Sequence, residues 1–440
     1  MSKQLTAIII ILILFLILGG VFGYFYFRSD SSDTTPTSNP RPTVAGDAGF
    51  PVGEQTGVRS NEQGVSINTN DNIESSDDAD SFIISGVGDS LTAPRRLVNI
   101  PVAGMTVYNN IIGQTVVRYI ERETGHTEDH PIDESAPSRV TDTTIPKVFN
   151  AVFGKGGEAV VLQEFTDEIN SIGTVYAEVV KAKSADAPPT AQILGDPNLA
   201  TVVGSLEGSL LPDSVQSVAV SPDGKSFLYM DASSDGGVAL VAPADRTKLD
   251  KPVTAFASKL SEWVPDWPVS NTLTFTTKAS ANLPGFMYIT SVANKSSRLL
   301  LKNIPGLTAK MSPDGQLVVY AENVGTGFSA SVYSVAKDRS TRLSLRTLPE
   351  KCVWSKKSGS TLYCAVPVSV PAGIYPDDWY MGFTLFNDEL WRVDTVSGET
   401  TRLSTTGNQD MIKLILDDKE ENIFWINKAD STVWTLQLLN

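Results

Sequence analysis

The side chains best suited to binding a ligand gather in one insertion of the chain, between Val366 and Glu389. They are Tyr375, Asp377, Asp378, Trp379 and Tyr380. Aromatic rings beside carboxylates are typical of binding surfaces, because the rings supply contact area and the carboxylates orient a partner. We therefore expect this insertion to form a ligand-binding loop. The alternative is a loop that folds over the middle of its domain and fills it.

The two histidines of the chain, His126 and His130, are four residues apart. On a helix this spacing would place both rings on one side, where they could hold a metal. Their surroundings read instead as a strand or turn, in which they would lie about 13 Å apart. We therefore expect solvated histidines, no metal site and no cofactor. The sequence also lacks a Gly-x-Ser-x-Gly elbow and a P-loop, which removes the commonest hydrolase and nucleotide-binding motifs.

The two cysteines, Cys352 and Cys364, flank a predicted hairpin whose centre is Ser358-Gly359. Because they are equally far from the turn, they would lie opposite one another on adjacent strands. A disulfide is expected if the domain is in an oxidising compartment. Two buried, unpaired thiols are the alternative.

An internal repeat indicates how these residues are positioned. Residues 218–229 closely match residues 309–320, since both contain Ser-Pro-Asp-Gly between two apolar runs. Weaker copies occupy residues 152–162, 266–275, 353–363 and 414–424. The repeats recur about every 45 residues with two longer intervals, as expected for four-stranded blades of a β-propeller. Proline presets φ in this turn and glycine supplies a positive φ, so the turn aspartates are expected to be structural.

The two ends of the repeat region predict how the ring closes. Only two strands fit after residue 416, whereas residues 94–97 resemble the outer strands of other blades and lead into a seventh repeat at residues 104–108. An N-terminal strand would therefore complete the last blade and remove its exposed edge. We predict an all-β fold with seven blades over residues 92–440, with six or eight blades as alternatives. The insertion would join the second and third strands of its blade, on the face that carries the connections between blades.

The Ser-Pro-Asp-Gly units resemble the WD-like repeats of TolB-like propellers, which also occur in the propeller domains of prolyl-oligopeptidase-type peptidases. The resemblance covers about residues 92–440, and two of the copies are strong. It implies the propeller fold and, where no catalytic domain is attached, a protein-binding or envelope-scaffold role. We expect no α/β-hydrolase domain in this chain.

The N-terminal part predicts attachment to a membrane. Residues 5–27 carry no charge, and a helix of this length would span about 35 Å, more than the hydrocarbon core. We predict a transmembrane signal-anchor helix within residues 1–28, with a cytoplasmic N-terminus and an extracytoplasmic C-terminal domain; a cleaved signal peptide is the alternative. Residues 29–91 are acidic and rich in Ser, Thr and Asp, which indicates a disordered linker. Its apolar stretch at residues 82–84 is expected to dock on the propeller.

Charge and motifs together define the expected function. The net charge of −15 opposes binding to a phosphate backbone, so nucleic acid is not an expected partner. We expect a membrane-anchored, surface-displayed propeller that acts as a non-enzymatic binding or scaffold module for an envelope protein or a glycan. The alternative is a hydrolase or lyase that uses carboxylates at the central channel. A third possibility is a structural subunit of a larger complex.

Overall fold

The computed structural model describes residues 84–87, 93–134, 136–166, 171–181, 203–404 and 407–438. The chain divides into two compact units, residues 1–75 and 76–440, and the description below concerns the second. Residues 5–27, the predicted anchor, lie outside the described residues, as does most of the predicted linker. Within the described part, no helix has the length and apolar character needed to cross a membrane. The anchor therefore stays a prediction.

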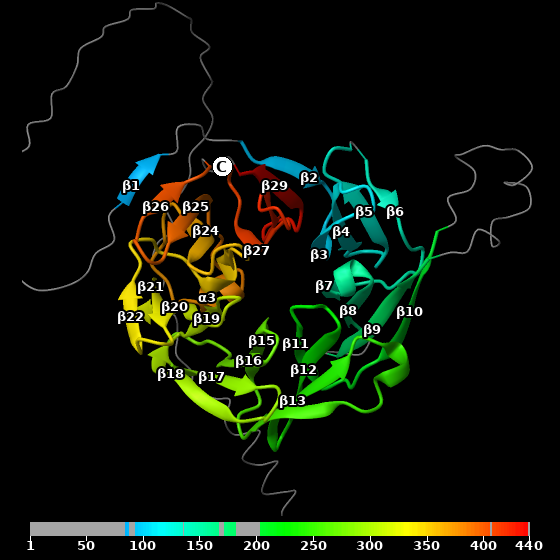
Figure 1. Ribbon diagram of the computed structural model, residues 1–440, viewed down its shortest axis with the longest axis horizontal. Coiled ribbons are helices and arrows are strands. Elements are labelled where there is room, and N and C mark those ends of the chain that lie inside the picture. The colour runs from blue at the N-terminus through cyan, green and yellow to red at the C-terminus, as the bar shows by residue number, and fades with distance from the viewer. Residues whose placement is uncertain are drawn as a thin grey trace, which may run out of the picture. The chain divides into compact units, whose positions relative to one another are not determined.

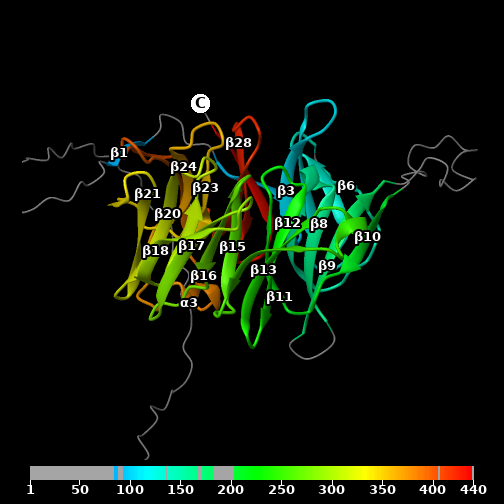
Figure 2. The same cartoon turned by 60° about the horizontal axis from the view of Figure 1, so that its bottom comes forward.

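Seven sheets are arranged in a ring, which confirms the prediction of a seven-bladed all-β propeller (Figures 1 and 2). From the axis outward, blade one contains β3 (Val102–Asn109), β4 (Thr115–Glu121), β5 (Thr127–Pro131) and β6 (Ser138–Arg139). Blade two contains β7 (Val148–Gly154), β8 (Ala159–Phe165), β9 (Ile172–Val180) and β10 (Ser205–Leu210). Blade three contains β11 (Val215–Val220), β12 (Ser226–Ser233), β13 (Gly236–Pro243) and β14 (Val253–Ser258).

The remaining blades repeat this antiparallel plan. Blade four contains β15 (Trp263–Val269), β16 (Thr272–Thr277), β17 (Pro284–Ser291) and β18 (Ser297–Pro305). Blade five contains β19 (Thr308–Met311), β20 (Leu317–Val324), β21 (Gly327–Ser334) and β22 (Arg339–Arg342). Blade six contains β23 (Cys352–Trp354), β24 (Thr361–Pro367), β25 (Asp388–Asp394) and β26 (Thr400–Arg402). Blade seven contains β27 (Met411–Leu416), β28 (Asn422–Asn427) and β29 (Val433–Gln437).

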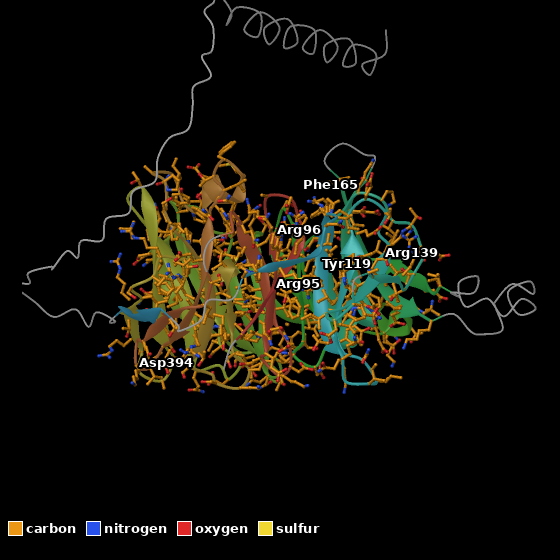
Figure 3. All side chains as sticks on the ribbon, turned by 90° about the horizontal axis from the view of Figure 1, so that it is seen from above. Arg95, Arg96, Tyr119, Arg139, Phe165 and Asp394 are labelled. Atoms are coloured by element: carbon orange, nitrogen blue, oxygen red, sulfur yellow. A yellow bond between two sulfur atoms is a disulfide. The ribbon has the colours of Figure 1, made fainter. Side chains whose placement is uncertain are left out.

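Blade seven is completed by β2 (Arg95–Val98), as predicted from the sequence. Figure 3 labels Arg95 and Arg96 on this strand. Arg95 pairs with Thr435 of β29, and the Arg96 guanidinium lies over the Trp434 ring at 5.1 Å from its centroid. Leu97 is buried between blades seven and one. A strand from the N-terminal side of the repeat region therefore closes the ring and serves as the outer strand of blade seven.

A fifth strand, β1 (Ile84–Val87), extends blade six. It pairs in parallel with β26, with Ile84 opposite Thr400. This strand includes Ile84, the last residue of the apolar stretch 82–84, and its backbone pairs with blade six. The other two residues of the stretch lie outside the described residues.

The turn motif has the local structure that its residues predict. The Ser221 hydroxyl donates to the Asp223 carboxylate at 2.6 Å, which in turn accepts the Lys225 N–H at 3.1 Å. Gly224 has φ of 67°, a value that glycine adopts without steric cost. The second strong copy repeats these bonds around Asp314. The turn aspartates are therefore occupied by their own turns.

Neighbouring blades are joined by apolar packing and by side chains that donate to carbonyl groups of the next blade. The core between blades three and four, for example, includes Leu228, Met230, Trp263 and Phe275. Examples of such hydrogen bonds are those from Arg118 to Gly157 (3.0 Å), Gln163 to Val215 (3.4 Å), Ser217 to Trp263 (3.0 Å), Lys310 to Cys352 (2.8 Å), Lys351 to Met411 (3.1 Å) and Lys413 to Ala103 (3.2 Å). Each bond supplies a partner to a carbonyl group that is not hydrogen-bonded to another strand of its own blade.

Candidate functional site

The predicted binding insertion, residues 368–387, connects β24 to β25, the second and third strands of blade six, as expected. We call it the strap. It contains the one-turn helix α3 (Asp377–Tyr380) and lies on one face of the propeller (Figure 2). The strap contacts η4 (Pro349–Lys351), which connects blades five and six, through a hydrogen bond from Tyr380 to Glu350. It therefore lies on the face that carries the connections between blades.

The inward side of the strap is aromatic and buried. Tyr375 and Trp379 pack with Phe328 of blade five and Phe386 in one apolar cluster. The Tyr375 ring lies 5.3 Å from that of Phe328, and the Trp379 ring stacks on Phe386 at 6.2 Å. The Tyr375 hydroxyl donates to the Pro371 carbonyl at 2.8 Å, so its polar atom is also satisfied. These two predicted binding residues hold the strap against the propeller.

The two acidic residues of the strap accept hydrogen bonds from the protein itself. Asp377 accepts from the Ser280 hydroxyl at 3.0 Å and the Ala281 N–H at 2.7 Å, both in blade four. Asp378 accepts the Ile374 N–H at 2.8 Å within the strap. Both carboxylates therefore organise the loop. Their predicted role toward a ligand stays a prediction.

A fully buried charge cluster lies directly beneath the strap. The Lys351 ammonium donates to Asp410 and lies 2.7 Å from the Asp388 carboxylate. The other Asp410 oxygen accepts the Trp379 indole N–H at 2.8 Å and the Phe386 N–H at 3.1 Å. Burial raises the pKa of Asp388 to about 6, a shift that Lys351 opposes. Two carboxylates thus share one ammonium in a site without water access, and the cluster ties the strap to blades six and seven.

The outward side of the strap is apolar and exposed. Phe383 is 78% and Met381 59% exposed, and neighbouring apolar side chains on the strap are also open to solvent. We call this set the apolar patch; its members are Val368, Ile374, Met381, Phe383 and Leu385. Exposed apolar side chains that gather on one segment often mark an interaction site. These residues were not predicted as a binding surface, although the apolar run Met-Gly-Phe-Thr-Leu-Phe at 381–386 is visible in the sequence.

Ionisable side chains also gather where the innermost strands of blades four and five meet the strap. Burial raises the pKa of Asp266 and of Glu350 and lowers the pKa of Lys310. The negative charges of the two acids act on Lys310 and oppose the lowering of its pKa. The Tyr380 hydroxyl donates to Glu350, and burial raises its pKa well above the usual value. Groups whose pKa is shifted by burial beside a charged partner are often found at functional sites. Asp266 and Glu350 are the carboxylates that an enzymatic role would use.

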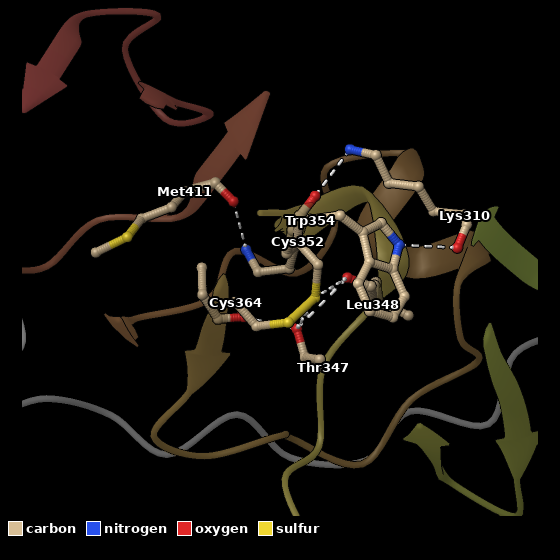
Figure 4. Close-up of a disulfide and its surroundings, with 9 residues drawn as sticks. Lys310, Thr347, Leu348, Cys352, Trp354, Cys364 and Met411 are labelled. Atoms are coloured by element: carbon tan, nitrogen blue, oxygen red, sulfur yellow. Dashed lines mark hydrogen bonds between the residues drawn. A yellow bond between two sulfur atoms is a disulfide. The ribbon is translucent and has the colours of Figure 1, made fainter. Parts of the chain in front are cut away.

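The cysteines and histidines occupy structural positions. Cys352 and Cys364 lie directly opposite one another on β23 and β24 and form a disulfide with an S–S distance of 2.09 Å (Figure 4). His130 is buried, contrary to the expectation of a solvated ring, because it lies within β5 and its Nε2 is 3.2 Å from the Glu134 carbonyl oxygen. His126 lies just before β5 and near Thr144. No group of three or more potential metal ligands occurs among the described residues.

The chain was compared with family models, curated proteins and solved structures. No protein-family model and no curated protein matches the chain. Among solved structures, an oligogalacturonate lyase from Vibrio parahaemolyticus is 8% identical, with a TM-score of 0.48 over 81% of this chain and 96% of that one. TolB from Acinetobacter baumannii is 11% identical, with a TM-score of 0.39 over 68% of this chain and 66% of the other. A puromycin-hydrolysing peptidase from Mycobacterium tuberculosis is 12% identical, with a TM-score of 0.44 over 75% and 52% of the two chains.

Proposed function

We propose that this protein is a membrane-anchored, extracytoplasmic binding module whose strap docks a protein of the envelope. The observation that carries the proposal is the apolar patch, which projects from a strap whose inward side is already fixed by packing and buried charge. The patch stays exposed, and Tyr375 and Trp379 already fill the inward side of the strap. An apolar partner surface is the ligand that its chemistry fits.

The location of the module in the envelope depends on the anchor at residues 5–27, and the binding proposal depends on the strap alone. The disulfide accords with an oxidising compartment, where such bonds persist. A glycan is a weaker fit to the patch, because its exposed members offer few hydrogen-bonding groups.

The test is a comparison of two matched double variants of the full-length protein in its native membrane. In the first, Met381→Ser and Phe383→Ser remove the most exposed members of the apolar patch. In the control, Ile111→Ser and Ile112→Ser change side chains that are 104% and 79% exposed in the hairpin between β3 and β4, at the opposite end of the strands.

Cross-linking with quantitative mass spectrometry should identify a protein that is captured by the wild type and the control and lost with the strap variant. Direct binding of that purified protein should then show the same order. Equal capture by both variants would contradict the proposal, and capture that is abolished by glycosidase treatment would favour a glycan instead.

The second candidate is a hydrolase or lyase that uses carboxylates at the inner wall. The group formed by Asp266, Lys310 and Glu350 supports it, because burial raises the pKa of both acids. Screening of polysaccharide substrates with the wild type and with Glu350→Gln tests this candidate. Turnover that disappears in the variant would establish an enzyme, and its absence across the screen would leave the binding module.

A further inference from the structure

Lys413 has an unusual backbone conformation on the innermost strand of blade seven. Its φ is 52°, and the pairing of β27 with β28 is irregular between Ile412 and Ile415. A positive φ costs a residue with a Cβ about 1 kcal/mol, and such bulges commonly redirect a side chain near a functional site. The Lys413 side chain is exposed to solvent although protein surrounds it. It therefore occupies the accessible inner wall of the ring.

The ammonium of Lys413 is held by neutral groups of the two following blades. Its Nζ donates to the Ala103 carbonyl of β3 at 3.2 Å and to the Asn150 side-chain oxygen of β7 at 2.8 Å. Asn150 is itself oriented, because its Nδ2 donates to Gln163 at 2.9 Å. An ammonium has three N–H groups, so these two bonds fix its direction and leave one donor for another acceptor.

The charge that acts on Lys413 is positive. Burial and the nearby Arg122 guanidinium lower the pKa of Lys413 to about 8, so the amine still carries its proton at neutral pH. Arg122 donates to the Ser431 hydroxyl at 3.1 Å. In the described part of the chain, neither cation has a carboxylate within ion-pair distance.

Two buried cations elsewhere in the molecule have carboxylate partners. Lys351 is shared by two aspartates, and Arg118 forms two hydrogen bonds to Asp129, both of 2.7 Å. Two neighbouring cations without a carboxylate form a site whose electrostatics an anion would complete. A preorganised ammonium and guanidinium are also the usual donors to carboxylate and phosphate oxygens.

We propose that Lys413 and Arg122 form a binding site for the carboxylate or phosphate group of a small molecule that enters along the axis of the ring. The site is separate from the apolar patch and does not depend on the proposed function. Lys413 donates its remaining N–H to the anion, and Arg122 supplies a second positive charge from blade one.

The first test is calorimetric titration of the full-length protein in detergent with inorganic phosphate and, separately, with citrate. We expect saturable binding of one anion that weakens about ten- to one-hundredfold in Lys413→Met, the range of a charge-assisted hydrogen bond, and to a smaller extent in Arg122→Gln. Lys302→Met, which removes an exposed charge on β18, should bind as the wild type does. The better probe of the two distinguishes a phosphate ligand from a carboxylate ligand.

A second test uses the unmodified chain and does not depend on whether a variant folds. Brief acetylation with an N-hydroxysuccinimide ester, followed by peptide mapping, measures the reactivity of each lysine. Saturating citrate or phosphate should protect Lys413 and leave Lys302 unchanged. The proposal is overturned if neither anion binds saturably. It is also overturned if Lys413→Met binds as tightly as the wild type or if Lys413 is not protected, because the anion would then bind at an adventitious surface site.

Discussion

Replacing Lys351 with methionine should destabilise the propeller more than the loss of any single surface charge. The Lys351 side chain is fully buried, lies 2.7 Å from the Asp388 carboxylate and donates to Asp410. Methionine keeps most of the apolar stem but leaves two carboxylates close together without water or a counter-charge. Removing one partner of a buried ion pair costs about 3–5 kcal/mol, and we expect a loss in the free energy of unfolding in this range at neutral pH.

Urea unfolding of the full-length protein in detergent measures this loss, and tryptophan fluorescence reports on it because Trp379 donates to Asp410. The loss should be smaller at pH 5 than at neutral pH, since the unpaired carboxylates can then take up protons. A packing defect would have no such dependence. Lys302→Met on the exposed face of β18 is the control, and its effect should stay within about 0.5 kcal/mol. A loss below about 1 kcal/mol in Lys351→Met at neutral pH would show that the buried cluster does not hold the strap.

Three further substitutions test the cluster, the disulfide and the ring closure. The folded pKa of Asp388 is about 6 and its ordinary value is 3.8. Between pH 3.8 and about 6, Asp388 therefore keeps its proton in the folded chain and has released it in the unfolded chain. The wild type should therefore lose up to about 3 kcal/mol as the pH rises through this window, and Asp388→Asn should lack this part of the fall in urea titrations at several pH values. Joint replacement of Cys352 and Cys364 by alanine should cost about 3 kcal/mol in the same assay, with no free thiol detectable in the denatured, unreduced wild type. Leu97→Ala on β2 should cost about 2–5 kcal/mol and increase proteolysis on the N-terminal side of blade one, whereas an unchanged midpoint would mean that β2 does not close the ring.

Most of the architecture could be predicted because it follows from local patterns. A turn such as Ser221-Pro-Asp-Gly224 defines its own hydrogen bonds, and its recurrence sets the number of blades. The outer strand at residues 95–98 was predictable because blade seven had too few residues after β27 to complete itself. The position of the strap followed from the order of the strands. These features depend on spacing along the chain, which the sequence contains.

The direction in which strap side chains point was not predictable, because it depends on contacts between distant segments. Trp379 is buried since its indole finds Asp410, a residue 31 positions later, and Phe328 packs from blade five. Lys413 gave no signal at all in the sequence. Its role depends on a positive φ and on Asn150, which is 263 positions away.

The buried cluster and the apolar patch should depend on each other. Burying one phenylalanine side chain is worth about 1.5–3 kcal/mol, so a loosened strap would gain by turning Phe383 inward. The inward side is closed to it as long as Tyr375 and Trp379 fill that space and Lys351 holds the acids that anchor Trp379. Lys351→Met should therefore weaken capture of the partner even though Lys351 is fully buried and cannot touch a partner. In the same cross-linking assay, a fully retained capture by a destabilised but folded Lys351→Met protein would show that the patch is presented without this support.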